Sequence, residues 1–203
     1  MGIIKTALEI ALEKTANVSS DKSSIASFNA EQTGKKIANM YLDAEIDLSA
    51  ELKKAEAEFR AEFGSGYEKH LKQGVFNVFL SKIALPASVE ALGKFDKLGK
   101  GFNVLINKKE FNSFFNRMIQ IFNQFLEEAA QYEQMIRQQY APKLRRKEEE
   151  LSKRLGREIH INPMEDQEFA AVLSQHINAL KSNYEYIVEE ARDEINKMFS
   201  GEK

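Results

Sequence analysis

Apolar residues from Phe111 to Ile136 recur at alternating gaps of four and three positions, which is the heptad seam of a helix packed against another helix. Beyond Ile136 they become sparse, and Glu, Lys and Arg dominate as far as Leu155. The pattern predicts one long helix from Lys108 to Leu155, with its first half buried and its second half in solvent.

Pro142 lies inside this predicted helix, where a proline removes one backbone hydrogen bond and clashes with the preceding turn. Because Tyr140 is a poor N-cap for a new helix, a bent but continuous helix is favoured over one that ends near Tyr140. Gly156 then supplies a C-terminal stop after two basic residues in the last turn.

A second long helix is predicted after the joint at residues 156–162. Asn162 is a good N-cap, Pro163 suits the first helical position, and Glu165 can bond back to the cap. Apolar residues from Phe169 to Met198 follow at about 3.6 residues per step, the period of a straight amphipathic helix. The two long helices therefore form an antiparallel, coiled-coil-like hairpin.

The first half of the chain reads as shorter helices. An apolar stripe predicts a helix over residues 3–15, and the polar stretch Asn17–Asp21 is the best candidate for a linker. A helix over residues 24–42 follows, weakened by Gly34 at its middle by about 1 kcal/mol relative to alanine. Asp47 caps a helix over residues 48–63, which ends at the Gly64–Gly66 segment.

A strongly apolar helix is predicted over residues 67–85, stopped by Pro86. Ser88 can cap the next segment, residues 89–106, which holds three glycines and reads as a short helix and then a looser turn. A strand over residues 102–106 is the alternative, although the sequence offers it no partner strand.

The predicted fold is all-α: a multi-helix bundle with a C-terminal hairpin that partly protrudes. A compact domain of this length is about 40–45 Å across, whereas the helix from Lys108 to Leu155 is roughly 70 Å long. That helix must protrude, bend sharply or be shared with another subunit. We expect an N-terminal bundle over residues 1–110 and the hairpin over residues 111–203 packed on it, as one structural unit.

Composition excludes several function classes. The net charge of −2 gives no global field that would attract nucleic acid or membranes. The absence of cysteine removes disulfides, thiolate nucleophiles and zinc–thiolate sites, and it is compatible with a reducing cytosol. No apolar run approaches the length of a membrane span, so we expect a cytoplasmic protein without a membrane partner.

The sequence offers few candidates for a catalytic, metal-binding or phosphate-binding site. His70, His160 and His176 fit no metal-ligand spacing, and no metal or cofactor is expected. The segment Gly93–Gly101 departs from a phosphate-binding loop in its spacing, and no strand precedes it. Phenylalanines crowd residues 95–125 at helical spacing, which favours a core or oligomer interface over a ligand pocket. Neither catalytic residues nor a small-molecule substrate are evident.

Basic residues cluster toward the joint, where residues 137–160 carry eight basic and four acidic side chains. The acidic return helix suggests that these charges pair across the hairpin and along it, as in Arg145–Glu149 and Arg146–Glu150. The other interpretation is a surface for an anionic partner such as RNA phosphates. The interaction surface predicted here comprises Arg137, Lys143, Arg145, Arg146, Lys147, Lys153, Arg154 and Arg157.

These patterns predict a non-enzymatic helical protein that acts as an interaction, scaffold or assembly module, with itself or with another protein. The alternative is an RNA- or ribosome-associated factor that contacts the phosphate backbone through the basic end of the hairpin. Tyr140 is the sole aromatic residue in the basic segment that could stack on a base.

Overall fold

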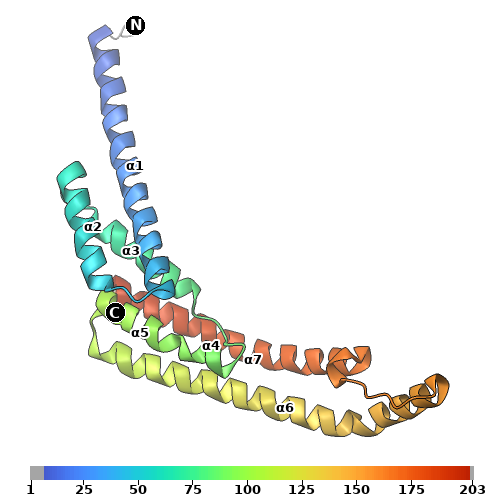
Figure 1. The fold of residues 1–203 in the computed structure, drawn as a ribbon. Helices are drawn as coiled ribbons and strands as arrows, with labels where there is room; N and C mark the ends of the chain where they lie inside the picture. Colours follow the sequence, from blue (N-terminus) through green and yellow to red (C-terminus); the bar gives the residue numbers. More distant parts are fainter. Residues whose placement is uncertain (1–6, 202–203) are drawn as a thin grey trace, which may run out of the picture. The chain divides into compact units, whose positions relative to one another are not determined.

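The protein is all-α, as the sequence pattern predicts (Figure 1). The computed structural model describes the backbone of residues 7–201 and the side chains of residues 22–201. Residues 3–6 of the first predicted helix lie outside that range. The helices are α1 (Ala7–Asp43), α2 (Leu48–Phe63), α3 (Glu68–Ser81), α4 (Val89–Gly93), α5 (Phe95–Ile106), α6 (Lys109–Leu155), the short 3₁₀ helix η1 (Pro163–Glu165) and α7 (Gln167–Ser200).

The chain forms two compact units. One comprises residues 1–82 and 97–107, and the other comprises residues 83–96 and 108–203. This division falls near the boundary expected at residue 110, except that residues 83–96 belong with the long helices. The expectation of a single structural unit stays a prediction.

Helix α1 passes through residues 17–21 without a break, so the linker predicted there is wrong. The segment contains neither glycine nor proline. Asn, Val, Ser and Asp each cost less than about 0.7 kcal/mol relative to alanine in a helix. A short polar stretch of such residues lowers helical propensity but does not end a helix. A break would have needed a residue such as glycine or proline.

The first unit is built around a close crossing of α1 and α3 at Gly34 and Gly74. A Cβ atom added to Gly34 would lie 2.1 Å from the carbonyl oxygen of Leu71, and one added to Gly74 would lie 2.1 Å from that of Glu31. The two backbones therefore touch because both residues lack a side chain. Gly34 weakens its own helix but is required by the packing.

The remaining boundaries of the first unit follow the local signals only in part. Asp47 caps α2 by accepting hydrogen bonds from the backbone N–H groups of Ser49 and Ala50. Helix α3 ends at Ser81, four residues earlier than predicted. The looser turn expected to lead into residues 102–106 and the alternative strand over those residues are both wrong, because α5 is helical from Phe95 to Ile106.

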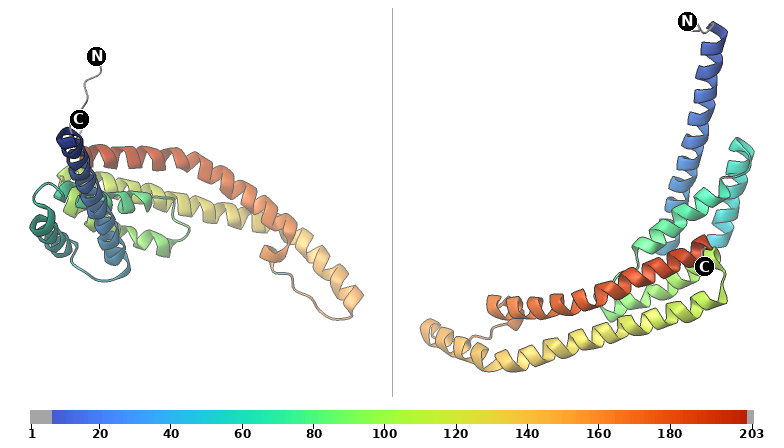
Figure 2. Two further views of the ribbon diagram at one scale, coloured as in Figure 1. Left: turned by 90° about the horizontal axis from the view of Figure 1, so that it is seen from above. Right: turned by 180° about the vertical axis from the view of Figure 1, so that it is seen from behind.

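The second unit contains α4, α6 and α7. Helix α6 continues through Pro142, as favoured from sequence, and Figure 2 shows it curved and lying beside α7. The helices are antiparallel, since Phe125 packs against Tyr184 while Ile136 packs with Phe169. Most of the Phe-rich segment is buried rather than lining a pocket: the buried members are Phe95, Phe102, Phe111, Phe115, Phe122 and Phe125.

Candidate functional site: the end of the helical hairpin

Residues 137–169, here called the hairpin end, contain every basic residue of the predicted interaction surface. Figure 1 shows α6 running beyond the start of α7, with the connecting segment folded back along α6. Gly156 ends α6 in the left-handed region at φ 65°, where a side chain is disfavoured. This matches the predicted stop.

The start of α7 differs from the prediction. Asn162 caps only the short helix η1, by accepting from the backbone N–H of Met164. Asp166 caps α7 four residues later, accepting from the N–H groups of Glu168 and Phe169. The Asn162–Pro163 signal begins only a single 3₁₀ turn. The α-helix begins after it, at Asp166, whose Oδ1 accepts two backbone hydrogen bonds where Asn162 accepts one.

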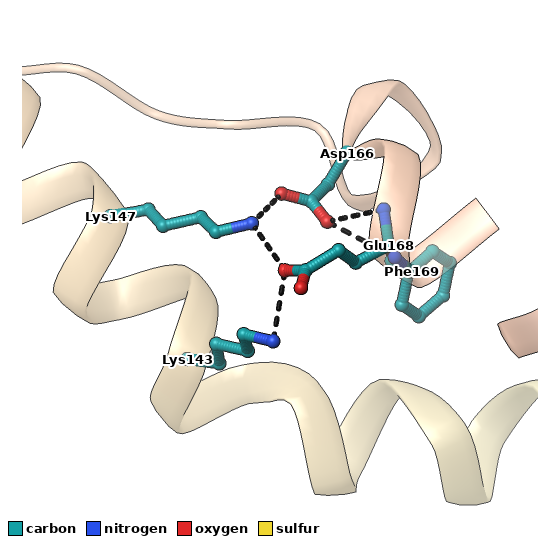
Figure 3. Close-up of polar contacts among 5 residues, drawn as sticks. All are labelled: Lys143, Lys147, Asp166, Glu168 and Phe169. Carbon is teal, nitrogen blue, oxygen red and sulfur yellow. Dashed lines mark hydrogen bonds and ion pairs between the residues drawn. The ribbon is translucent and has the colours of Figure 1, made fainter. Parts of the chain in front are cut away.

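Four charged side chains link α6 to the start of α7 (Figure 3). The ammonium of Lys147 lies 2.6 Å from Asp166 Oδ2 and 2.9 Å from Glu168 Oε2. The ammonium of Lys143 lies 2.9 Å from the same Glu168 oxygen. The Asp166 side chain is only 8% exposed, so its ion pair is the most shielded of the three. Lys143 and Lys147 thus pair across the hairpin.

The pKa values of these groups shift in the directions that ion pairing requires. Hydrogen bonds from Lys147 and then from the backbone of Phe169 lower the pKa of Asp166. Those from Lys143 and Lys147 lower the pKa of Glu168. Hydrogen bonds to these carboxylates raise the pKa of both lysines. All four groups therefore stay charged across the neutral range.

Side chains of α6 also tether the connecting segment directly. Glu148 Oε1 accepts a hydrogen bond of 2.9 Å from the backbone N–H of Ile161. Ser152 Oγ accepts one of 3.0 Å from the N–H of Ile159. The backbone of the segment is therefore held against the last turns of α6, and the hairpin end has a defined shape.

An apolar cluster lies beneath the charged one. Phe169 is fully buried and packs with Ile136 and Leu173. Tyr140 contacts the Phe169 ring edge to face, with centroids 5.8 Å apart. The guanidinium of Arg137 lies 5.6 Å from the same ring and also pairs with Glu133. Tyr140, the sequence's candidate for base stacking, is thus half-buried in internal packing.

The eight predicted interaction residues divide into two sets. Arg137, Lys143 and Lys147 are bound to partners within the hairpin. The side chains of the other five are exposed and, within residues 22–201, make no hydrogen bond or ion pair; these residues are Arg145, Arg146, Lys153, Arg154 and Arg157. The predicted pairs Arg145–Glu149 and Arg146–Glu150 do not form. We call these five residues the free basic set.

Sequence reasoning missed Asp166 and Glu168, the acidic half of the charged cluster. Their signal was present: an acidic N-cap and first turn opposite two lysines spaced four apart on α6. The register of the two helices, which the sequence pattern did not give, was needed to match them.

The family of the chain follows from comparison with known proteins. It belongs to DUF6657, a family of unknown function. The family model matches residues 49–197, so the whole hairpin end lies within the matched region. Nothing among curated proteins or solved structures matches the chain.

Neither a metal site nor a membrane span is found in the described part of the chain. Within it, no group of three or more His, Asp or Glu side chains is placed to hold a metal ion. None of the helices it contains is long and apolar enough to cross a membrane.

Proposed function

We propose that this protein is a non-enzymatic, cytoplasmic association module that binds a protein partner or a second copy of itself through the hairpin end. One observation carries the proposal: Leu155, an apolar side chain at the end of α6, is 57% exposed, and three members of the free basic set, Lys153, Arg154 and Arg157, lie within two residues of it in the chain. An exposed apolar residue flanked in the chain by unpaired charges suits a protein interface, with an apolar centre and a polar rim.

The packing of the described residues supports a role without catalysis. None of the residues that are buried among them is polar or charged. Active sites usually place titratable groups in apolar pockets that shift their pKa values. Here the lowered carboxyl pKa values of Asp166 and Glu168 belong to groups that are ion-paired with lysines of the same hairpin. A structural explanation therefore accounts for those shifts.

The alternative function is binding of RNA phosphates by the free basic set. Its five unpaired charges favour such contacts. Two features favour protein instead: Glu149 and Glu150 lie between the arginines on the exposed face of α6, and Tyr140 is engaged with Phe169. A filter-binding titration with bulk RNA at two salt concentrations tests the alternative, and absence of binding at low salt eliminates it.

The RNA test needs a variant that leaves the hairpin folded. Replacing Arg145 and Arg146 with glutamine removes two free charges and no internal contact. Lys147 is left in place because it holds Asp166 and Glu168. If RNA binds, this variant should bind less tightly and show a smaller salt dependence, by about one unit of slope for each phosphate that the protein no longer neutralises.

Site-specific photo-crosslinking tests the main proposal. A photoreactive residue at position 155 should capture a defined protein, either another copy of the chain or a host protein. The same residue at Glu58, an exposed position on α2, should not. Equal capture at both positions, or no capture at position 155, would refute an interface at the hairpin end.

A further inference from the structure

A groove runs between α6 and α7 in the half of the hairpin away from its end. It encloses about 520 Å³. Its floor is apolar and includes Phe114, Met118, Ile121 and Ile187, of which all but Met118 are partly exposed. A partly exposed apolar floor of this kind is typical of a binding groove.

The wall of the groove that α7 supplies is acidic. Glu190, Asp193 and Glu194 line it. Two basic residues, Arg117 and Lys197, also line the groove, and Lys197 lies 3.8 Å from Glu194. The surrounding stretch of α7, residues 185–194, carries five carboxylates and one arginine, Arg192. That arginine is held by Glu189 and by the carbonyl of Ile83.

The hairpin end has the complementary surface. Leu155 is exposed, and Lys153, Arg154 and Arg157 around it have no partner among the described side chains. One apolar anchor with three positive charges matches a groove that has an apolar floor and three carboxylates, which exceed the two cations of its lining, Arg117 and Lys197. Opposite charges placed this way steer association and fix the register of two surfaces.

From this match we infer that the occupant of the groove is the hairpin end of a second copy of the chain. The inference rests on the proposed function and names its partner. Because the two surfaces are different parts of the hairpin, the contact is heterologous, and each copy offers both halves of it. Such a contact builds rings or open chains of copies rather than closing at a two-fold dimer.

Sedimentation velocity at increasing protein concentration tests the inference. The wild-type protein should show mass rising beyond a dimer in about 0.1 M salt and losing that rise in about 1 M salt, where the Debye length falls to roughly 3 Å. Two charge-reversed variants should each stay monomeric. The end variant carries K153E, R154E and R157E, and the groove variant carries E190K, D193K and E194K.

Mixing the two variants supplies the decisive measurement. The acidic end of the first fits the basic groove of the second, and the reverse contact retains its native charges, so the mixture should regain the wild-type mass. That recovery would also show that both variants are folded. A matched control, E58K with E62K, reverses exposed unpaired charges on α2 and should assemble like the wild type.

Other outcomes separate this inference from the proposed function. If the end variant stays monomeric but the folded groove variant assembles like the wild type, the groove does not bind the hairpin end. An interface at the hairpin end would still be supported. A wild-type protein that is monomeric at every concentration overturns the inference; capture of a host protein at position 155 would still support the proposed function. A mixture that fails to assemble, with both variants helical by circular dichroism, also overturns the inference.

Discussion

Replacing Gly34 with alanine adds one methyl group where α1 and α3 meet backbone to backbone. That methyl carbon would lie 2.1 Å from the Leu71 carbonyl oxygen and 3.1 Å from the Cα atom of Gly74. Contacts between carbon and a carbonyl oxygen normally lie at about 3.3–3.6 Å. The obstacle is main chain, so no rotamer change removes it, and the helices must separate by more than about 1 Å.

The loss of stability comes from the side-chain packing that this separation weakens. Ala30, Leu71 and Val75 are fully buried around the crossing and lose part of their packing. Forcing an extra methyl group into a packed core costs about 1–3 kcal/mol, occasionally more. Alanine regains about 1 kcal/mol of helical propensity over glycine. Since the clash is severe and rigid, we expect a net loss of about 2 kcal/mol.

Urea denaturation followed by circular dichroism measures that loss, and hydrogen exchange of the α1 and α3 amides localises it. Gly93→Ala is the matched control. Nothing lies within 4 Å of its added methyl group, so the variant should be neutral or up to about 1 kcal/mol more stable. A Gly34→Ala protein as stable as this control would refute the close crossing of α1 and α3.

Three further predictions concern the second unit. Phe169→Ala should destabilise the hairpin by about 3–5 kcal/mol in urea denaturation, because it empties a fully buried site; Met164→Ala, at a half-exposed position, should stay within about 0.5 kcal/mol of wild type, and equal losses would contradict the packing. Folding lowers the pKa of Asp166, so the stabilisation from its ionised form is present above the unfolded value of about 3.9 and lost as the pH falls through the lower folded value. NMR titration of its carboxyl carbon should give a midpoint below about 3.9 that rises in Lys147→Gln, and an unchanged midpoint would argue against the ion pair. Burial, with a hydrogen bond to Glu128, raises the pKa of Tyr184 to about 12. The stabilisation from the neutral phenol of Tyr184 is therefore complete below the unfolded pKa of about 10 and is lost as the pH rises through 12. The difference between the ultraviolet titrations of wild type and Tyr184→Phe isolates this phenol, and ionisation near 10 would contradict its burial.

The sequence predicted those parts of the fold that depend on local signals. The bounds of α2 and the C-terminal stop at Gly156 follow from residues that act within one turn. It failed where a choice depended on distant residues. Gly34 reads locally as a weak point in a helix, and only the position of α3 shows why alanine does not fit there.

The candidate site was predicted in the same uneven way. The basic residues were identified from composition, but their roles depend on helix register, because the face of α6 toward α7 holds Lys143 and Lys147 while the outer face holds Arg145 and Arg146. Residues two positions apart on a helix point in different directions, so one charged run contains both structural and exposed members. Finding Asp166 and Glu168 required the register of both helices.

The apolar packing of the hairpin is divided into separate clusters along its length. One cluster of the described residues contains Phe125, Leu180 and Tyr184, and another, at the hairpin end, contains Ile136, Phe169 and Leu173. Cooperative units of a fold open with their own free energies, often well below that of global unfolding. The cluster at the hairpin end can therefore open while the other stays closed. A protease or a binding partner that captures this opened form would meet α7 released from α6 only near its start, with the rest of the hairpin still folded.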